Sequence, residues 1–453
     1  MSAGWVASCS KPAARSATGP GHIVLISVDT LRADHLSSFG YPRRTSPAFD
    51  AVAEGGVTFD AAFAQRGLTW PSLTSILTGR YPGSHGVRDN PGWLDASIRT
   101  LPEMLQAGGY STAAFLTNMT SAPNRGLDTL EVFPTTTPGL TRERTADTLA
   151  TRAAMAWLSD RGESKPFFLW LHLLAPHASY EPPPGYDELF TPPGEPAFDG
   201  QSETLSAITR EQRRLSEAEL VPIIGLYDGE VALIDTQVDM VLRKLSELGL
   251  SQSTLVVLTS DHGEELYERG FYFFHKCSIS DAVLHIPLVL RLPGVLPAGR
   301  RVGAVVESID IAPTILELAG LERPPSLQGR SLLSLIEPNG AEGWKGTAFS
   351  ELGEKVSSVR TARWRYIANP LGASVQFLER EGEACYPIAR EELFDHEIDP
   401  GEQTNVAERY PSVTAEMRRR IREWRQATEL ARSSKSEIDA ETLEQLRALG
   451  YLK

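Results

Sequence analysis

Two apolar segments that lie far apart in the sequence constrain the fold most strongly. Residues 23–28 and 255–258 are apolar almost throughout, and each run is followed closely by potential metal ligands, Asp29 after the first and Asp261 and His262 after the second. Apolar runs without alternation are typical of strands buried on both faces of a sheet. Ligands at the C-terminal ends of such strands meet in the crevice of an open α/β sheet. The two segments therefore predict an ion site at that edge.

Around these segments, predicted strands alternate with predicted helices, which indicates a parallel sheet. We expect strands over residues 23–28, 110–116, 167–173, 254–259 and 287–292. We expect helices over residues 46–54, 72–77, 101–107, 142–158 and 223–248. The predicted fold class is α/β, with a large, mainly parallel sheet sandwiched by helices in a domain of residues 21–338.

The pattern changes in the C-terminal part of the chain. Residues 356–368 and 392–395 are typical of antiparallel strands, and residues 411–430 have the spacing of an amphipathic helix. These segments predict a small C-terminal α+β subdomain over residues 339–430. The remaining predicted segments are a disordered N-terminal segment, 1–20, and an amphipathic tail, 431–453.

Composition excludes two classes of partner. The net charge of -14 and the pI of about 5.2 argue against a nucleic-acid partner, which requires a basic face. No apolar run approaches the roughly 18 residues of a membrane-spanning helix. We therefore expect neither nucleic acid nor a transmembrane segment.

The cysteines leave the compartment open. Cys9, Cys277 and Cys385 are too few for a disulfide framework, and none has CxxC spacing. Residues 6–9 resemble the cleavage box of bacterial lipoproteins, although the residues before this box are too few for a signal peptide. We expect a location in the cell envelope or periplasm, with possible lipid attachment at Cys9, while a cytoplasmic location stays open.

The candidate site combines an ion with a hydroxyl group. Asp29, Asp261 and His262 supply two carboxylates and an imidazole, which can hold one divalent cation. In the alternative interpretation, Asp261 and His262 only cap the turn after their strand. Thr69 lies between the two strands in sequence, and an ion that lowered the pKa of its hydroxyl would make it a nucleophile. An isolated threonine is usually only a polar residue, so this assignment depends on its context.

Six segments, in order along the chain, resemble motifs of the sulfatase family within the alkaline phosphatase superfamily. They are residues 28–36, 69–82, 172–183, 259–264 with 275 and 285–288, 309–314, and 392–395 with 399–400. The series covers residues 21–453 and identifies the chain as a member of the family. The resemblance implies a metal-dependent hydrolase of sulfate or phosphate esters. It implies one divalent ion, Ca²⁺ by family, with Mn²⁺ or Zn²⁺ as alternatives.

The chain also departs from the family pattern. Sulfatases carry a cysteine or serine, oxidised to formylglycine, where this chain has Thr69, and threonine cannot be converted in that way. Leu73 replaces an expected arginine, and Thr30 replaces an acidic metal ligand. By alignment, this chain has Thr117 and Met119 near the positions at which the family carries a lysine and a histidine. The resemblance therefore implies a metal-activated, unmodified Thr69, as in the phosphoryl-transfer branch of the superfamily.

The resemblance assigns further roles to the side chains around the ion. Asp29, Thr69, Asp261 and His262 would form the metal shell. His177 and His275 would act as the acid for the leaving group or as donors to the developing oxyanion. Lys276 and Thr30 would bind the anionic substrate. In the alternative interpretation, each histidine only anchors its loop, and Lys276 is only solvated.

Three functions stay open at this point. The first is hydrolysis of a small anionic ester, possibly on a glycan or lipid. The second is transfer of a phosphoryl or head group to envelope glycans or lipids, which the absence of a membrane span disfavours. The third is a catalytically inactive binding module, which retention of Asp29, Thr69, Asp261 and His262 disfavours. We expect the hydrolase.

Overall fold

The computed structural model describes residues 20–90, 92–118, 124–137, 140–141, 145–161, 165–194, 197–270, 272–337, 340, 343–344, 346–370, 372 and 387–428. Cys9, the N-terminal segment up to residue 19, and the predicted tail 431–453 lie outside the described residues.

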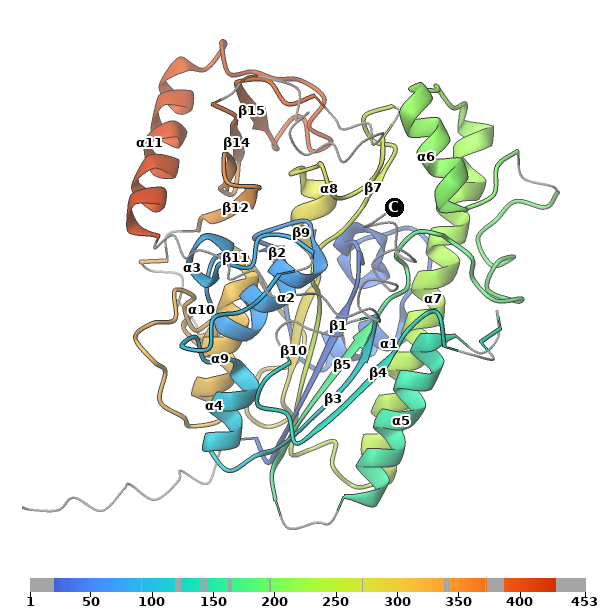
Figure 1. The fold of residues 1–453 in the computed structure, drawn as a ribbon, viewed down its shortest axis with the longest axis vertical. Helices are drawn as coiled ribbons and strands as arrows, with labels where there is room; N and C mark the ends of the chain where they lie inside the picture. The colour runs from blue at the N-terminus through green and yellow to red at the C-terminus, as the bar shows by residue number, and fades with distance from the viewer. Residues whose placement is uncertain are drawn as a thin grey trace, which may run out of the picture.

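A mixed, mostly parallel sheet forms the centre of the protein (Figure 1). Within the described residues it has nine strands in the order β11-β2-β10-β6-β1-β5-β3-β4, and β9 pairs with β2. These are β1 (His22–Val28), β2 (Val57–Phe63), β3 (Ser111–Thr117), β4 (Thr129–Phe133), β5 (Phe167–Leu173), β6 (Thr254–Ser260), β9 (His285–Ile286), β10 (Leu288–Arg291) and β11 (Arg300–Glu307). The predicted fold class is confirmed.

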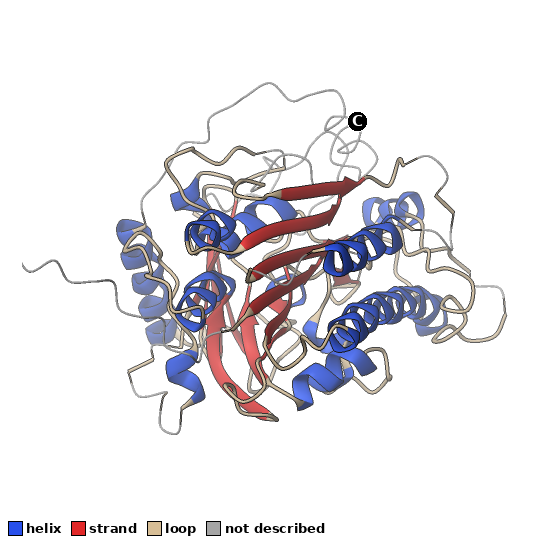
Figure 2. Ribbon diagram, turned by 90° about the horizontal axis from the view of Figure 1, so that it is seen from below, coloured by secondary structure: helices blue, strands red, loops and turns tan. Residues whose placement is uncertain are grey.

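Helices cover both faces of the sheet (Figure 2). The longer ones are α1 (Pro47–Glu54), α2 (Thr69–Thr78), α4 (Leu101–Ala107), α5 (Ala146–Asp160), α6 (Ser202–Glu211), α7 (Glu217–Glu247) and α9 (Ile311–Leu318). Side chains of β1 alternate between two cores: Ile23 and Leu25 pack with α2, α4 and α9, whereas Val24 and Ile26 pack with α1, α5 and α7. This double burial explains why the strand is apolar throughout.

Short elements complete the region built on the large sheet. They are α3 (Pro82–His85), α8 (Asp281–Leu284), α10 (Leu333–Ile336), the hairpin β7 (Glu265–Leu266) and β8 (Phe273–Phe274), and 3₁₀ turns at Ala33–His35, Ser37–Phe39 and Ser308–Asp310. The strand predicted over 287–292 is present as β10, but it runs antiparallel to β6 and β2. Helix α2 begins at Thr69, three residues before the predicted start. Helix α7 begins at Glu217 behind a capping box of Ser216 and Glu219, ahead of its predicted start.

A second, antiparallel sheet lies beside the first. It has the order β12-β13-β14-β15, formed by β12 (Ala348–Leu352), β13 (Val356–Arg360), β14 (Trp364–Ala368) and β15 (Glu391–Asp395). Helix α11 (Pro411–Ala427) packs on it through Met417 and Ile421, with Val359, Tyr366 and Leu393 of the sheet. The last turn of α11 carries Trp424, whose ring stacks on Phe349 of β12. The same ring contacts Tyr81, which lies outside the second sheet.

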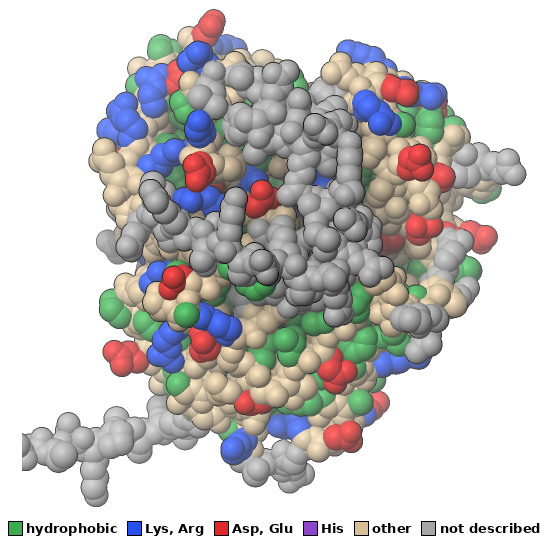
Figure 3. Space-filling model, viewed as in Figure 1, with side chains coloured by type: hydrophobic (Ala, Val, Ile, Leu, Met, Phe, Trp, Pro, Cys, Tyr) green, Lys and Arg blue, Asp and Glu red, His purple; other side chains and the backbone are tan. Residues whose placement is uncertain are grey.

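The surface carries charges of both signs. Acidic and basic side chains are interspersed over the face shown in Figure 3. Within the described ranges, no helix has the length and apolar character that crossing a bilayer requires.

Two buried carboxyl groups, those of Glu307 and Asp310, lie near the contact between the large sheet and the second sheet. Glu307 accepts hydrogen bonds from the Tyr81 hydroxyl (2.8 Å) and from the Phe349 amide (2.8 Å), and the Glu307 amide donates to Asp310 (2.9 Å). Burial, followed by the charge of Asp310, raises the pKa of Glu307 to about 8. Burial raises the pKa of Asp310 to about 6. The folded protein therefore holds a proton at Glu307 that the unfolded chain releases at lower pH.

This difference predicts a pH-dependent effect of Glu307→Gln. Because the folded pKa is raised, wild-type stability falls as the pH rises from about 5 to about 8, and the amide variant escapes this fall. We expect Glu307→Gln to gain about 1–3 kcal/mol over wild type across this interval, measured by urea unfolding. The exposed Glu408→Gln should follow wild type at every pH. Parallel curves for Glu307→Gln and wild type would contradict the burial argument.

Candidate active site

The register of three adjacent parallel strands brings the predicted ligands together. Val28, the last residue of β1, lies opposite Leu173 of β5 and Ser260 of β6. The Asp29 amide donates to the Leu173 carbonyl (2.8 Å), and the Asp261 amide donates to the Val28 carbonyl (3.3 Å). The residues after all three strands therefore meet at one edge of the sheet, and the sequence predicted this meeting for the residues after β1 and β6.

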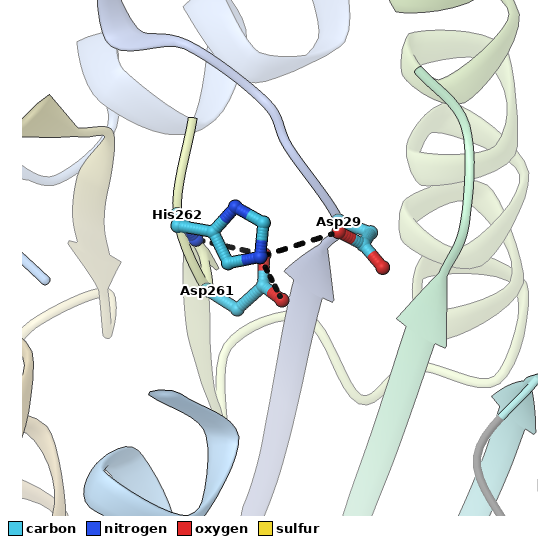
Figure 4. Close-up of side chains that lie close together, drawn as sticks. All are labelled: Asp29, Asp261 and His262. Atoms are coloured by element: carbon cyan, nitrogen blue, oxygen red, sulfur yellow. Dashed lines mark hydrogen bonds and ion pairs between the residues drawn. The ribbon is translucent and has the colours of Figure 1, made fainter. Parts of the chain in front are cut away.

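Asp29, Asp261 and His262 converge on one point (Figure 4). His262 Nε2 lies 3.7 Å from Asp29 Oδ1 and 3.5 Å from Asp261 Oδ2, and the ligand atoms of the three residues lie within 4.8 Å of one another. All three side chains are buried. Among the residues that the structure describes, Asp29 Oδ1, Asp261 Oδ2 and His262 Nε2 have no hydrogen-bond partner. Buried polar atoms are normally satisfied, so three orphaned acceptors facing one another fit a cation.

The other atoms of these side chains are held in place. His262 Nδ1–H donates to the Gly263 carbonyl (2.9 Å), which leaves a lone pair on Nε2 for a ligand bond. Asp261 Oδ1 accepts from the amides of His262 (2.7 Å) and Thr30 (3.3 Å). Thr30 has a positive φ of 52°, and its buried hydroxyl oxygen has no hydrogen-bond partner.

Without a cation, this cluster is electrostatically unfavourable. Burial, followed by the charge of Glu264, raises the pKa of Asp29 well above its usual value. Burial, followed by the charge of Asp29, does the same to the pKa of Asp261. Burial, followed by His275, lowers the pKa of His262. A divalent ion would stabilise the ionised form of both carboxylates, because it would offset their mutual repulsion and replace the lost solvation.

Thr69 lies beside this cluster as the first residue of α2. Its hydroxyl donates to Asp29 Oδ2 (3.3 Å), and its side chain is buried. The Ser72 hydroxyl donates to the Asp261 carbonyl (2.6 Å), and the Trp70 amide donates to Asn90 Oδ1 (3.0 Å). These two bonds fix the first turn of α2 against the end of β6.

Both predicted histidines also lie at this edge. The His275 ring is 4.5 Å from the His262 ring and 5.2 Å from the His177 ring, between centroids. His177 Nδ1–H donates to the Ala178 carbonyl (2.7 Å). Burial lowers the pKa of both His177 and His275, and the charge of half-buried Lys276 adds to both shifts. Lys276 therefore lies close enough to act on this cluster.

Two acidic residues that the sequence did not single out hold these histidines. Glu264 Oε1 pairs with His275 Nδ1 (3.0 Å), and Glu264 Oε2 accepts from the Tyr180 hydroxyl (2.6 Å). Asp147 accepts from the amides of Leu174 (2.7 Å) and Ala175 (3.1 Å), which anchor the loop before His177. Glu264 directly follows Gly263 in the metal motif, and this position was the available signal. Asp147 gives no local signal in the sequence.

The structure adds one covalent bond near the site. Cys277, two residues after His275, is disulfide-bonded, and its partner lies outside the described residues. Cys277 therefore does not offer a free thiol.

Comparisons with known proteins identify the family of the chain. The sulfatase family model matches residues 21–321, and the model for the C-terminal part of N-sulphoglucosamine sulphohydrolase matches residues 268–427. Arylsulfatase K of Mus musculus is 29% identical, over 83% of this chain and 74% of its own length. N-acetylglucosamine-6-O-sulfatase of Bacteroides thetaiotaomicron is 24% identical, over 88% and 85%.

Solved structures share the fold. A protein in complex with its substrate D-glucosamine-2-N,6-O-disulfate has a TM-score of 0.73 at 21% identity, over 90% of this chain and 98% of that one. The phosphonate monoester hydrolase of Agrobacterium radiobacter has a TM-score of 0.72 at 23% identity, over 90% and 96%. The family model spans well over half of the chain and includes every residue of the candidate site. The protein belongs to the sulfatase family and is an ester hydrolase.

Proposed function

We propose that this protein hydrolyses sulfate or phosphate esters with unmodified Thr69 as the nucleophile, beside one divalent cation. The supporting observation is the convergence of Asp29 Oδ1, Asp261 Oδ2 and His262 Nε2, all buried and without hydrogen-bond partners, next to a Thr69 hydroxyl directed at Asp29. No oxidation of residue 69 is required in this scheme.

Asp29, Asp261, His262 and Thr69 would hold the cation. Two carboxylates with one imidazole accept Ca²⁺, Mn²⁺ or Zn²⁺, and Ca²⁺ is the expectation from the family. When bound, the cation supplies positive charge that lowers the pKa of a nearby hydroxyl and neutralises anionic ester oxygens.

The reaction proceeds in two halves. Thr69 Oγ attacks the sulfur or phosphorus, its proton passes toward Asp29, and the bond to the alcohol oxygen breaks. His177 or His275 gives a proton to the departing alcohol. Water then cleaves the bond at Thr69 and releases inorganic sulfate or phosphate. Lys276 and Thr30 would bind the non-bridging oxygens.

The names of the relatives bear on the ester. The two relatives named above are sulfatases, one of them an N-acetylglucosamine-6-O-sulfatase, whereas one structural neighbour is a phosphonate monoester hydrolase. The names of these sulfatases support a small anionic ester on a sugar as the substrate. Retention of Asp29, Thr69, Asp261 and His262 argues against an inactive binding module. The disulfide at Cys277 favours an oxidising compartment, such as the periplasm or envelope.

Cation binding gives the first prediction of this proposed function. At a free Ca²⁺ or Mn²⁺ concentration about a hundred times its dissociation constant, wild type should gain about 3 kcal/mol of stability, because only the folded state binds the ion. Asp261→Asn should lose most of this gain, measured by thermal unfolding with and without EDTA. Asp235→Asn is the matched control, since buried Asp235 accepts from the Ala48 and Phe49 amides of α1 and is not one of the proposed ligands. An equal gain in wild type and Asp261→Asn would remove Asp261 from the metal shell.

The nucleophile gives the second prediction. We expect Thr69→Ala to lower kcat about a thousand-fold or more, while Thr69→Ser retains turnover through its hydroxyl. Thr74→Ala, which removes another buried hydroxyl of α2, should retain turnover. Rapid acid quench and mass spectrometry should show a sulfo or phospho group on Thr69, and its mass identifies the ester. Unchanged turnover in Thr69→Ala would exclude this nucleophile.

Glu264 gives the third prediction. Glu264→Gln leaves one acceptor oxygen for two donors, so His275 or Tyr180 loses its partner. We expect kcat to fall about ten- to a hundred-fold with cation affinity retained. Tyr180→Phe should have a smaller effect, since the carboxylate still holds His275. Full activity in Glu264→Gln would mean that His275 needs no such orientation.

A further inference from the structure

Arg66 is a buried cation with almost no partner. It is 4% exposed, and its Nη1 donates only to the Glu351 carbonyl, at 3.4 Å. Its Nε is buried and has no hydrogen-bond partner, and within the described residues no carboxylate forms an ion pair with it. Burial lowers the pKa of Arg66. A buried charge in this state is costly and calls for an explanation.

Arg365 shows how this protein satisfies a buried structural arginine. It is 0% exposed, and its guanidinium donates to the Ile279 carbonyl (2.9 Å) and to the Ser358 hydroxyl (3.2 Å). It also forms ion pairs with Asp281 and with Glu402 (2.6 Å to Oε1). Among the described residues Arg66 forms no such ion pair, and the carboxylates of Asp89 and Glu351 act on it only through their charge, so its charge is compensated less than that of Arg365.

The position of Arg66 connects it to the site. It precedes Thr69 by three residues, and a Cβ on the next residue, Gly67, would lie 3.3 Å from the His275 carbonyl oxygen. The loop that carries Arg66 is therefore packed against the His275 segment. The charge of Arg66 contributes to the lowered pKa of His275, and exposed Asp89 acts on Arg66 from the solvent side. Arg66 thus lies within electrostatic range of His275 and of exposed Asp89.

The site also lacks a cation that the family provides. Leu73 stands where the family carries arginine, and its side chain is fully buried in the core, so it offers no charge to an anion. Arg66 does not replace that arginine at the reacting atom, because it lies on the His275 side. In the proposed reaction, His275 is one of the two histidines that would face the departing alcohol.

We propose that Arg66 binds a second anionic group, carried on the alcohol part of the ester. The preferred substrates are then doubly anionic esters, such as a sugar ester with a neighbouring sulfate or carboxylate. A guanidinium forms paired, charge-assisted hydrogen bonds with either group. This inference rests on the proposed function for the reacting end of the substrate.

The test compares a phenyl ester with the 2-, 3- and 4-carboxyphenyl esters, as sulfates and as phosphates. We expect at least one carboxyphenyl isomer to have a kcat/KM about ten-fold or more above phenyl in wild type, as one desolvated charge pair supplies. Arg66→Met should abolish this preference, and Arg66→Lys should keep part of it. Arg425→Met is the matched control, because Arg425 also acts on Glu351 but donates to Ser357 and to the Lys355 carbonyl.

Three outcomes overturn the inference while leaving the hydrolase intact. They are the absence of any preference in wild type, survival of the preference in Arg66→Met, and its equal loss in Arg425→Met. A melting temperature of Arg66→Met far below wild type would also overturn it, since that result marks a structural arginine. We expect the melting temperature to hold or rise, whereas Arg365→Met should fall.

A binding measurement decides the matter even if no ester is turned over. Benzenesulfonate and the three sulfobenzoate isomers are titrated by calorimetry into the Ca²⁺-loaded protein. We expect at least one sulfobenzoate isomer to bind wild type about ten-fold more tightly than benzenesulfonate does. Arg66→Met should bind that isomer and benzenesulfonate with equal affinity. Inactivity with all esters, together with this binding difference, would reject the proposed hydrolysis but keep the anion site. Equal binding of every ligand to wild type would reject the anion site.

Discussion

Mutual repulsion between two buried carboxylates is the constraint on which the centre of this protein depends. Asp29 and Asp261 are brought together by the pairing of β1 with β6, and the pKa of each is raised by burial and by a neighbouring acid. Hydrogen bonds satisfy Asp261 Oδ1, but the oxygens facing His262 stay without partners. The fold thus builds an unfavourable cluster that a cation would stabilise, and Thr69 donates to one of its members.

An acidic cluster elsewhere in the protein shows why convergence alone is insufficient. Asp281, His396 and Glu402 also lie within ligand distance of one another. Arg365 pairs with both acids there, and Arg360 pairs with Asp281 (3.1 Å). Guanidinium groups already compensate these carboxylates, so this cluster ties the second sheet to α8 and leaves no demand for an ion. The difference between the two clusters is the presence of orphaned acceptors in the first.

The sequence predicted those parts of the fold in which burial leaves a local signal. β1, β5 and β6 are covered on both faces, so they are apolar along most of their length, and the candidate ligands directly follow β1 and β6 in the sequence. β2 was missed because Asp60 interrupts its apolar run, and β11 was missed because it starts with two arginines. The direction of β10 depends on its neighbours in the sheet. The pairing of Glu264 with His275 and the surroundings of Arg66 depend on tertiary structure, which spacing in the sequence does not reveal.

Anomalous diffraction from crystals grown with Mn²⁺ tests the central claim most directly. The account predicts a single strong peak within bonding distance of Asp29 Oδ1, Asp261 Oδ2 and His262 Nε2, with the Thr69 oxygen beside it. A peak elsewhere, or these three side chains rotated apart around an empty centre at saturating Mn²⁺, would contradict it.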